Sequence, residues 1–302
     1  MTTVTETEPT TSTKAAKDPD QSFSLSRSPV YIAVALIALI WTIPTVGLLI
    51  NSFREPRSIR ATGWWTVLGD LFNSATWTLE NYANVLERGF GNAFANSAAV
   101  TIPSVAIPIT VAAFAAYAFA WMKFPGRNLI FAAVVGLMVV PLQMALIPIL
   151  RVYTGFNLNG TFPAVWLAHA GFGLPLAVYL FRNYIGSLPS SIIESAEIDG
   201  ADHYKIFTRL ILPLSTPVIA AFAVLQFLWI WNDYLVALVF LGVANPDNAV
   251  LQVELANLAG RGEGALSLLP AAAFITVVVP MVVFFLLQRF FVRGLTAGSV
   301  KG

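Results

Sequence analysis

Six long apolar segments constrain this chain more than any other feature of its sequence. A hydrocarbon core of about 30 Å needs about 20 mostly apolar residues in a helix. Apolar residues make up 57% of the 302, more than a soluble domain of this length can bury. The sequence therefore predicts an all-α integral membrane protein with six transmembrane helices. Their approximate bounds are 29–51, 94–121, 128–150, 163–184, 213–241 and 268–291.

The composition excludes several kinds of site and partner. Without cysteine, the chain can form neither a disulfide nor a thiolate metal site. His169 and His203 are the only histidines, and they lie too far apart in the sequence to suggest a metal site. A net charge of +1 offers no basic stripe to nucleic acid, and no G-x-x-x-x-G-K-[ST] loop is present for ATP phosphates. We expect no catalytic residue, no metal and no nucleic-acid partner.

The chain divides into a polar tail, a membrane domain and a second, short tail. Residues 1–28 are Thr-rich and lack apolar periodicity, which predicts a disordered tail and not a signal peptide. The spans occupy 29–291, and 292–302 forms the other tail. With the amino terminus inside, eleven of the 17 Lys and Arg residues are cytoplasmic, as the positive-inside rule favours. Both termini, and a polar loop at about 189–212, are then predicted to be cytoplasmic.

Two long loops are predicted on the exterior side. The first, about 52–93, contains two stretches typical of short amphipathic helices, with Trp64, Trp65 and Trp77 suited to the membrane interface. The second, about 242–267, is rich in Gly and Asn and long enough to reach an external partner. Kinks are predicted at the prolines within the spans: Pro103, Pro108, Pro141, Pro148, Pro175 and Pro280.

One predicted cytoplasmic loop concentrates charge in a chain that is only 11% charged. In the stretch SIIESAEIDGADHYKIFTRLILPLSTP, Ser191 and Glu194 predict a capping box, and Gly200 suits the left-handed position after a helix. Asp202 predicts the N-cap of a second helix, which runs to the next span at Pro213. Two interpretations follow from these residues. The loop is either an amphipathic connector on the lipid headgroups or a rigid helix–turn–helix that transmits a push to that span.

This loop resembles the E-A-A loop of permease subunits in ATP-binding-cassette (ABC) importers, whose pattern is E-A-A-x3-G-x9-I-x-L-P. Five positions match in step: Glu194, Ala196, Gly200, Leu212 and Pro213. Ser195 and Leu210 replace the second and the isoleucine positions of the pattern. In that family the loop is a coupling helix seated in a cleft of the ATPase subunit. The resemblance therefore implies a coupling role for Ile193, Glu194, Ser195, Ala196, Asp199, Gly200, Leu212 and Pro213.

Other segments extend the resemblance over nearly the whole chain. The stretches AAYAFAWMKFPGR, VVPLQMALIPI and FLWIWNDYLVAL are similar to carbohydrate permeases, above all to the alpha-glucoside branch. The final residues, GLTAGSVKG, resemble the tail of the six-span permease of the maltose importer, which reaches between two ATPases. This similarity implies ATPase contacts at Gly294, Leu295, Thr296, Ala297 and Gly298.

The resemblance also supplies the expected function and partners. It implies a transport subunit without catalysis of its own, in the cytoplasmic membrane of a bacterium or archaeon. Its partners would be two ATPase subunits, which bind the ATP and Mg²⁺, a second permease, an extracytoplasmic sugar-binding protein and membrane lipid. No cofactor is expected on this chain. The implied substrate is an alpha-glucoside or maltose-like sugar, and a glycerol phosphodiester is the alternative within the family.

Polar groups inside the spans are candidate solute contacts. Asp233 lies roughly 30 Å along a helix from Pro213, near the exterior end, where it is either structural or on the solute path. Asn232 and Gln143 carry amides suited to sugar hydroxyls, and His169 is expected to be a hydrogen-bonded helix-packing residue. An ion-driven secondary transporter, the other transport class, usually has midplane carboxylates or inverted repeats. A scaffold or receptor leaves the loop pattern unexplained.

Overall fold

The structure is a computed structural model that describes residues 28–69, 71–73, 76–242 and 246–296. It consists of two parts, one ending at Val46 and one beginning at Gly47. Except for residue 28, the predicted tail 1–28 lies outside the described residues. In the described part the chain is helical, and its only β-pairing is an isolated bridge between Arg54 and Trp77. The prediction of an all-α fold is confirmed.

The six apolar windows coincide with helices, but two of them are strongly bent. Four helices are long and apolar enough to cross a membrane: Pro29–Ser52, Glu80–Trp121, Phe162–Gly186 and Leu269–Gln288. The windows 128–150 and 213–241 correspond to bent pairs. Arg127–Val139 meets Leu142–Gly155 at 104°, and His203–Leu214 meets Thr216–Trp231 at 67°. The described residues thus hold four spans, or up to six if each bent pair is one span.

Among the elements of the described residues, only helix α1, Ser28–Ser52, begins in the first part. Its large apolar side chains from Val30 to Ile43 are exposed, as expected of a helix that faces lipid.

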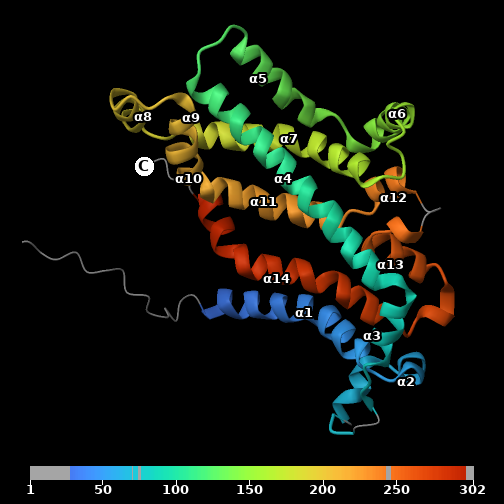
Figure 1. Cartoon of the computed structure of the whole chain (residues 1–302). Coiled ribbons are helices and arrows are strands. Elements are labelled where there is room, and N and C mark those ends of the chain that lie inside the picture. The colour runs from blue at the N-terminus through green and yellow to red at the C-terminus, as the bar shows by residue number, and fades with distance from the viewer. Residues whose placement is uncertain (1–27, 70, 74–75, 243–245, 297–302) are drawn as a thin grey trace, which may run out of the picture. The chain divides into compact units, whose positions relative to one another are not determined.

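In the second part, long helices run side by side and short elements gather at their ends. Figure 1 shows α4, α7 and α11 next to one another, α8 to α10 at one end, and α12 and α13 at the other. The helices are α2 (Pro56–Ala61), α3 (Glu80–Val85), α4 (Gly91–Trp121), α5 (Arg127–Gly136), α6 (Leu142–Gly155), α7 (Phe162–Gly186), α8 (Ser190–Ile198), α9 (His203–Ile206), α10 (Leu212–Leu214), α11 (Thr216–Trp231), α12 (Leu235–Leu241), α13 (Leu251–Ala259) and α14 (Leu269–Thr296).

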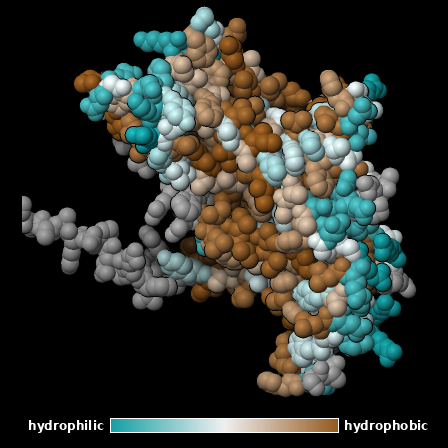
Figure 2. All heavy atoms as spheres, viewed as in Figure 1, coloured by the Kyte–Doolittle hydropathy of each residue, from teal (hydrophilic) through white to brown (hydrophobic). Residues whose placement is uncertain are grey.

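The surface follows the membrane pattern. Figure 2 shows apolar residues over the middle of α4, α5 and α11 and hydrophilic residues over α8 and α9 and near α13, at the two ends. Inside, small residues let α4 and α7 approach closely, because Ala112 and Ala116 on α4 and Ala177 on α7 are fully buried. Phe181 of α7 and Phe222 of α11 fill the space beside them, with ring centroids 5.6 Å apart.

Gly173 of α7 makes room for a buried amide from α11. The side chain of Gln226 is buried, and its Nε2 donates a hydrogen bond to the backbone carbonyl of His169 at 3.3 Å. A Cβ atom on residue 173 would overlap the Gln226 amide. A side chain at this position would therefore force the buried Gln226 amide to shift.

We expect Gly173→Ala to lower the thermal stability of the protein in detergent. Overpacking of this kind costs typically about 1–3 kcal/mol. Gly171→Ala is the matched control, because a Cβ there meets no atom within 4 Å. The apparent melting temperatures of both variants, measured by size-exclusion chromatography after heating, provide the test. Equal values would contradict the close approach of Gln226.

The prolines predicted to kink the spans differ in position: one lies at a break between helices, and five lie inside helices. Pro141 precedes α6 at the 104° break. The other prolines lie within helices that continue through them: Pro103 and Pro108 in α4, Pro148 in α6, Pro175 in α7 and Pro280 in α14. A proline removes one backbone hydrogen bond but leaves most of the packing surface of its helix intact, so neighbouring helices can hold it in place.

Both predicted exterior loops are folded. In the first, a 3-10 helix at Trp64–Gly69 and α3 occupy the two stretches predicted as short helices. Arg54 is buried there and donates hydrogen bonds to the Ser58 carbonyl at 3.2 Å and the Thr62 hydroxyl at 2.6 Å. The second loop contains α13, whose first N–H, at Leu251, donates to the Ser97 hydroxyl of α4 at 2.8 Å. This part of the loop packs against the protein instead of extending toward a partner.

Candidate coupling site and buried polar residues

Helix α8 begins one residue before Ser191, so the predicted capping box is wrong. Pro189 is the N-cap, with φ −60° and ψ 130°, and no side chain caps the helix. Ser191 lies inside the first turn, where its carbonyl accepts a hydrogen bond from the Ser195 hydroxyl at 2.8 Å. Pro189 already has the φ that leads the backbone into a helix, so Ser191 becomes helical and cannot act as the cap. The Glu194 carboxylate is left exposed.

Gly200 ends α8 in the left-handed conformation that the sequence predicts. Its φ is 76°, and its N–H donates to the Glu197 carbonyl at 3.0 Å. The N–H of Ala201 donates to the Ala196 carbonyl at 2.9 Å. Together these two bonds form a Schellman motif, and both alanines pack against the hydrophobic core, as such motifs favour. The end of α8 is thus specified by local hydrogen bonds.

A β-branched residue at position 200 should disrupt this turn. No atom lies within 4 Å of an added Cβ, so backbone strain alone decides the outcome. We expect Gly200→Val to cost at least about 1 kcal/mol locally and to abolish uptake while membrane insertion persists. Gly200→Asn, which tolerates a left-handed backbone, should retain most uptake. Normal uptake by the valine variant would remove this turn from the mechanism.

The segment after the turn bends before it reaches the next span. Asp202 caps α9 as predicted, since its Oδ1 accepts the Lys205 N–H at 2.8 Å. A π-helical turn at Phe207–Ile211 and α10 follow without a break, and α11 starts after the 67° bend. Helix α11 therefore begins at Thr216 and not at Pro213, and it meets the preceding segment at a bend, while the rigidity of this junction stays a prediction. Pro217, in the first turn of α11, opposes a straight continuation because its ring clashes with the preceding turn.

Helix α8 has an inward and an outward face. Ile193 is 6% exposed and packs in the core with Ala196. Ile198 is 87% exposed, and Tyr204, just beyond the turn, is 70% exposed. Six other residues with an implied coupling role lie at the surface: Glu194, Ser195, Asp199, Gly200, Leu212 and Pro213. Ile193 and Ala196 thus lie on the inner face of α8, whereas Glu194, Glu197 and Asp199 are exposed.

The family pattern missed Ile198 and Tyr204, the large side chains that the segment presents outward. Both flank the Gly200 turn. For Ile198, the spacing from Ile193 in the sequence could have indicated that it is exposed. Five residues advance a helix by about 140°, so Ile198 cannot share the buried face of Ile193. Ile198 is thus free to contact an apolar cleft of a partner, whereas Ile193 is buried within the protein, and the coupling role implied for Ile193 stays a prediction.

The three candidate solute-path residues differ in their surroundings. Gln143, in the first turn of α6, and Asn232, after α11, are exposed, and the Asn232 amide donates to the Leu228 carbonyl at 2.7 Å. A cavity of about 440 Å³ lies between α6 and α7, and its lining is apolar and includes none of the three. Asp233 alone is largely enclosed by the protein.

Asp233 stabilises a break between α11 and α12, where the sequence predicted one continuous span at 213–241. Its Oδ2 accepts the N–H groups of Val236 at 2.9 Å and Ala237 at 3.1 Å. The same oxygen lies 3.8 Å from Nε2 of His169 on α7. His169 is buried, as predicted for a packing residue, and its Nδ1 has no hydrogen-bond partner. These contacts support the structural interpretation of Asp233.

The predicted tail lies at the limit of the described residues. Helix α14 continues past the predicted span end at 291 to Thr296, so Gly294, Leu295 and Thr296 form its last turn. Ala297 and Gly298 lie outside the described residues. Contact of these five residues with ATPases stays a prediction.

Comparison with known proteins decides the family. Residues 108–297 match the model of the family described as binding-protein-dependent transport system inner membrane component. The chain belongs to this family. The permease is 56% identical over 274 residues to the osmoprotective compounds uptake permease protein GgtD of Synechocystis, covering 90% of this chain and 92% of that one. It is 43% identical to the alpha-glucoside transport system permease protein AglG of Rhizobium meliloti, covering 91% and 98%.

Solved structures show the same fold. A bacterial ABC transporter involved in the import of the acidic polysaccharide alginate contains a chain that matches the permease with a TM-score of 0.71 at 20% identity. The match covers 89% of the permease and 99% of that chain. The predicted resemblance to ABC importer permeases is thereby confirmed, and the relatives named above are transport subunits of the membrane and not enzymes.

Proposed function

We propose that the permease forms, with a second permease subunit, the membrane path of an ABC importer for a carbohydrate delivered by an extracytoplasmic binding protein. The observation that carries this proposal is the double-sided helix α8. Its inner face is held by the core through Ile193, whereas Glu194, Ile198 and Tyr204 point outward at one end of the bundle. A rigid turn that presents an apolar anchor among polar groups suits a cleft in another protein.

The charge of this surface favours a protein partner over the lipid surface. Glu194, Glu197 and Asp199 are exposed on or next to α8. Anionic headgroups repel carboxylates and attract Lys and Arg, which α8 lacks and which the loop carries only further on, at Lys205 and Arg209. ATPase subunits that bind this surface in the cytoplasm would move α8 when they close on ATP. The movement would open the path outward, and the last residues of the chain would lie near the same ATPases.

The substrate that we propose is an alpha-glucoside. Its support is the similarity to AglG, whose name assigns it alpha-glucosides. GgtD is named for osmoprotective compounds, which makes a sugar-containing osmoprotectant the nearest alternative. A glycerol phosphodiester would differ from both by its negative charge.

Uptake by a deletion strain tests the substrate. Radiolabelled trehalose, maltose and sucrose, which are all alpha-glucosides, are compared with glycine betaine and a glycerol phosphodiester. We expect uptake of at least one glucoside to be lost on deletion and restored by the intact gene, and to persist when ion gradients are collapsed at constant ATP. Loss of uptake confined to glycine betaine or the phosphodiester would contradict a sugar substrate. A permease that purifies without ATPases would contradict the coupling role.

A further inference from the structure

The bend between α10 and α11 raises the question of how a movement of α8 reaches the spans. We propose that a link between Tyr117 and His203 carries this movement directly to α4, in addition to the junction with α11. The inference rests on the proposed function, in which ATPases move α8. Tyr117 and His203 would then be positioning residues, since they act on the path through the helices that they join.

The hydrogen bond of the link joins two elements that are distant in the sequence. The Tyr117 hydroxyl lies 2.9 Å from Nδ1 of His203, 86 residues away. The two rings meet edge to face, with centroids 6.1 Å apart and planes at 71°. Tyr117 is 5% exposed, within α4, and His203 is the first residue of α9. Tyr117 is shielded whereas His203 is exposed, so the bond is partly screened from water.

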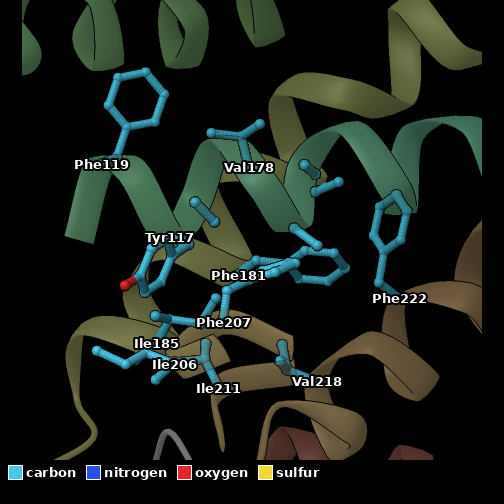
Figure 3. Packing of buried hydrophobic residues seen from close by; sticks show 14 of the residues in the cluster. Tyr117, Phe119, Val178, Phe181, Ile185, Ile206, Phe207, Ile211, Val218 and Phe222 are labelled. Atoms are coloured by element: carbon cyan, nitrogen blue, oxygen red, sulfur yellow. The ribbon is translucent and has the colours of Figure 1, made fainter. Parts of the chain in front are cut away.

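Aromatic packing reinforces the hydrogen bond. The ring of Phe207, in the π-helical turn, lies 5.5 Å from that of Tyr117 and 4.7 Å from that of Phe114, both on α4. Figure 3 shows Phe207, Ile206 and Ile211 gathered beneath Tyr117, and all three are buried. A displacement of α9 that left α4 behind would break the hydrogen bond and these ring contacts together.

Two other routes lead from the coupling segment to the spans. At the bend before α11, the buried Ser215 hydroxyl has no hydrogen-bond partner, whereas the Thr216 hydroxyl donates to the Pro213 carbonyl at 2.8 Å. The backbone also bonds across the bend, from the Ser215 N–H to the Ile211 carbonyl at 2.9 Å. Tyr184 of α7 donates to the Leu214 carbonyl of α10 at 3.2 Å, but this bond is exposed. Water can replace an exposed hydrogen bond at little cost, so this bond joins α7 to the coupling segment less firmly than the buried rings of Phe207 and Tyr117 join the segment to α4.

The test uses the complete importer, reconstituted with its ATPases, second permease and binding protein. The permease has no cysteine, so Ala95→Cys on the exposed surface of the other end of α4 takes a single bimane label. Its fluorescence change on trapping with ATP and vanadate reports movement of α4 without any solute. The second readout is the amount of radiolabelled glucoside imported per ATP hydrolysed. Tyr117→Phe and His203→Ala remove the hydrogen bond, and Tyr184→Phe is the matched control.

We expect Tyr117→Phe and His203→Ala each to lower the bimane response and the import per ATP by about two- to tenfold, as loss of one hydrogen bond predicts. The double variant should be no worse than either single variant, because both remove the same bond. His203→Asn should recover most of the loss, since its amide places a donor and an acceptor near the position of Nδ1. Tyr184→Phe should behave as the parent.

Several outcomes would overturn the link. These are parental behaviour of Tyr117→Phe and His203→Ala, additive losses in the double variant, or no recovery by His203→Asn. An ATP-insensitive bimane signal in the parent would also overturn it, because α4 would then not move. Failure of the proposed function differs from all of these, since the parent would lose its ATPases on purification or import no glucoside. In the second case the bimane readout still decides the link.

Discussion

Replacing Ile198 by Asp is expected to weaken the binding of ATPase subunits to the permease without lowering its thermal stability. Ile198 is 87% exposed, so the new carboxylate stays in water while the permease is alone. When α8 is docked in a cleft of the ATPase, the same substitution removes an apolar anchor and buries a charge. Loss of a well-packed interface anchor costs at least about 2 kcal/mol, roughly a 30-fold weaker affinity. Titration of purified ATPase onto the permease pair in nanodiscs measures this affinity.

Ile193 should give the opposite result. It is 6% exposed and shares a buried cluster with Ile206 and Ile211. We expect Ile193→Ala to lower the free energy of unfolding by about 2–5 kcal/mol, and Ile198→Ala to change it by less than about 0.5 kcal/mol. Weaker ATPase binding by Ile193→Ala at unchanged stability, or parental binding by Ile198→Asp, would reverse the assignment of the two faces of α8.

Replacing Asp233 by Ala should destabilise the permease more than replacing it by Asn. Alanine leaves the N–H groups of Val236 and Ala237 without their acceptor, in residues that are both buried. An unsatisfied buried donor costs about 1–3 kcal/mol. Asparagine keeps one side-chain oxygen and can still accept both bonds. Apparent melting temperatures in detergent should therefore fall in the order parent, Asp233→Asn, Asp233→Ala.

Uptake separates this structural role from contact with solute. If Asp233 only caps α12, Asp233→Asn should import glucoside at nearly the parental rate. A sharp loss of uptake by this variant at parental stability would instead place Asp233 on the solute path. Asn232→Ala is the matched control, because this neighbouring side chain is exposed and bonds only to a carbonyl of its own helix.

Features whose causes lie within a few residues of one another can be predicted from the sequence alone. Gly200 needs only the absence of a Cβ to adopt its φ of 76°, and Asp202 needs only the N–H of Lys205, three residues on. The capping box failed at the same short range, since the S-x-x-E pattern ignored Pro189, which starts α8 earlier. The apolar windows located the helices but not their bends, because hydropathy records composition and not direction.

Contacts between distant segments were not predictable. Ile193 and Ile198 have the same side chain five positions apart, and packing of α8 against the core decides which one is free for a partner. Likewise, the sequence around Tyr117 does not predict His203 as its neighbour, and the sequence around Asp233 does not predict His169. In a membrane protein the surface that faces lipid is as apolar as the surface that faces another helix. The sequence therefore determined the helices, the turn after α8 and the family, whereas the inner faces and buried polar contacts arose only when the helices packed.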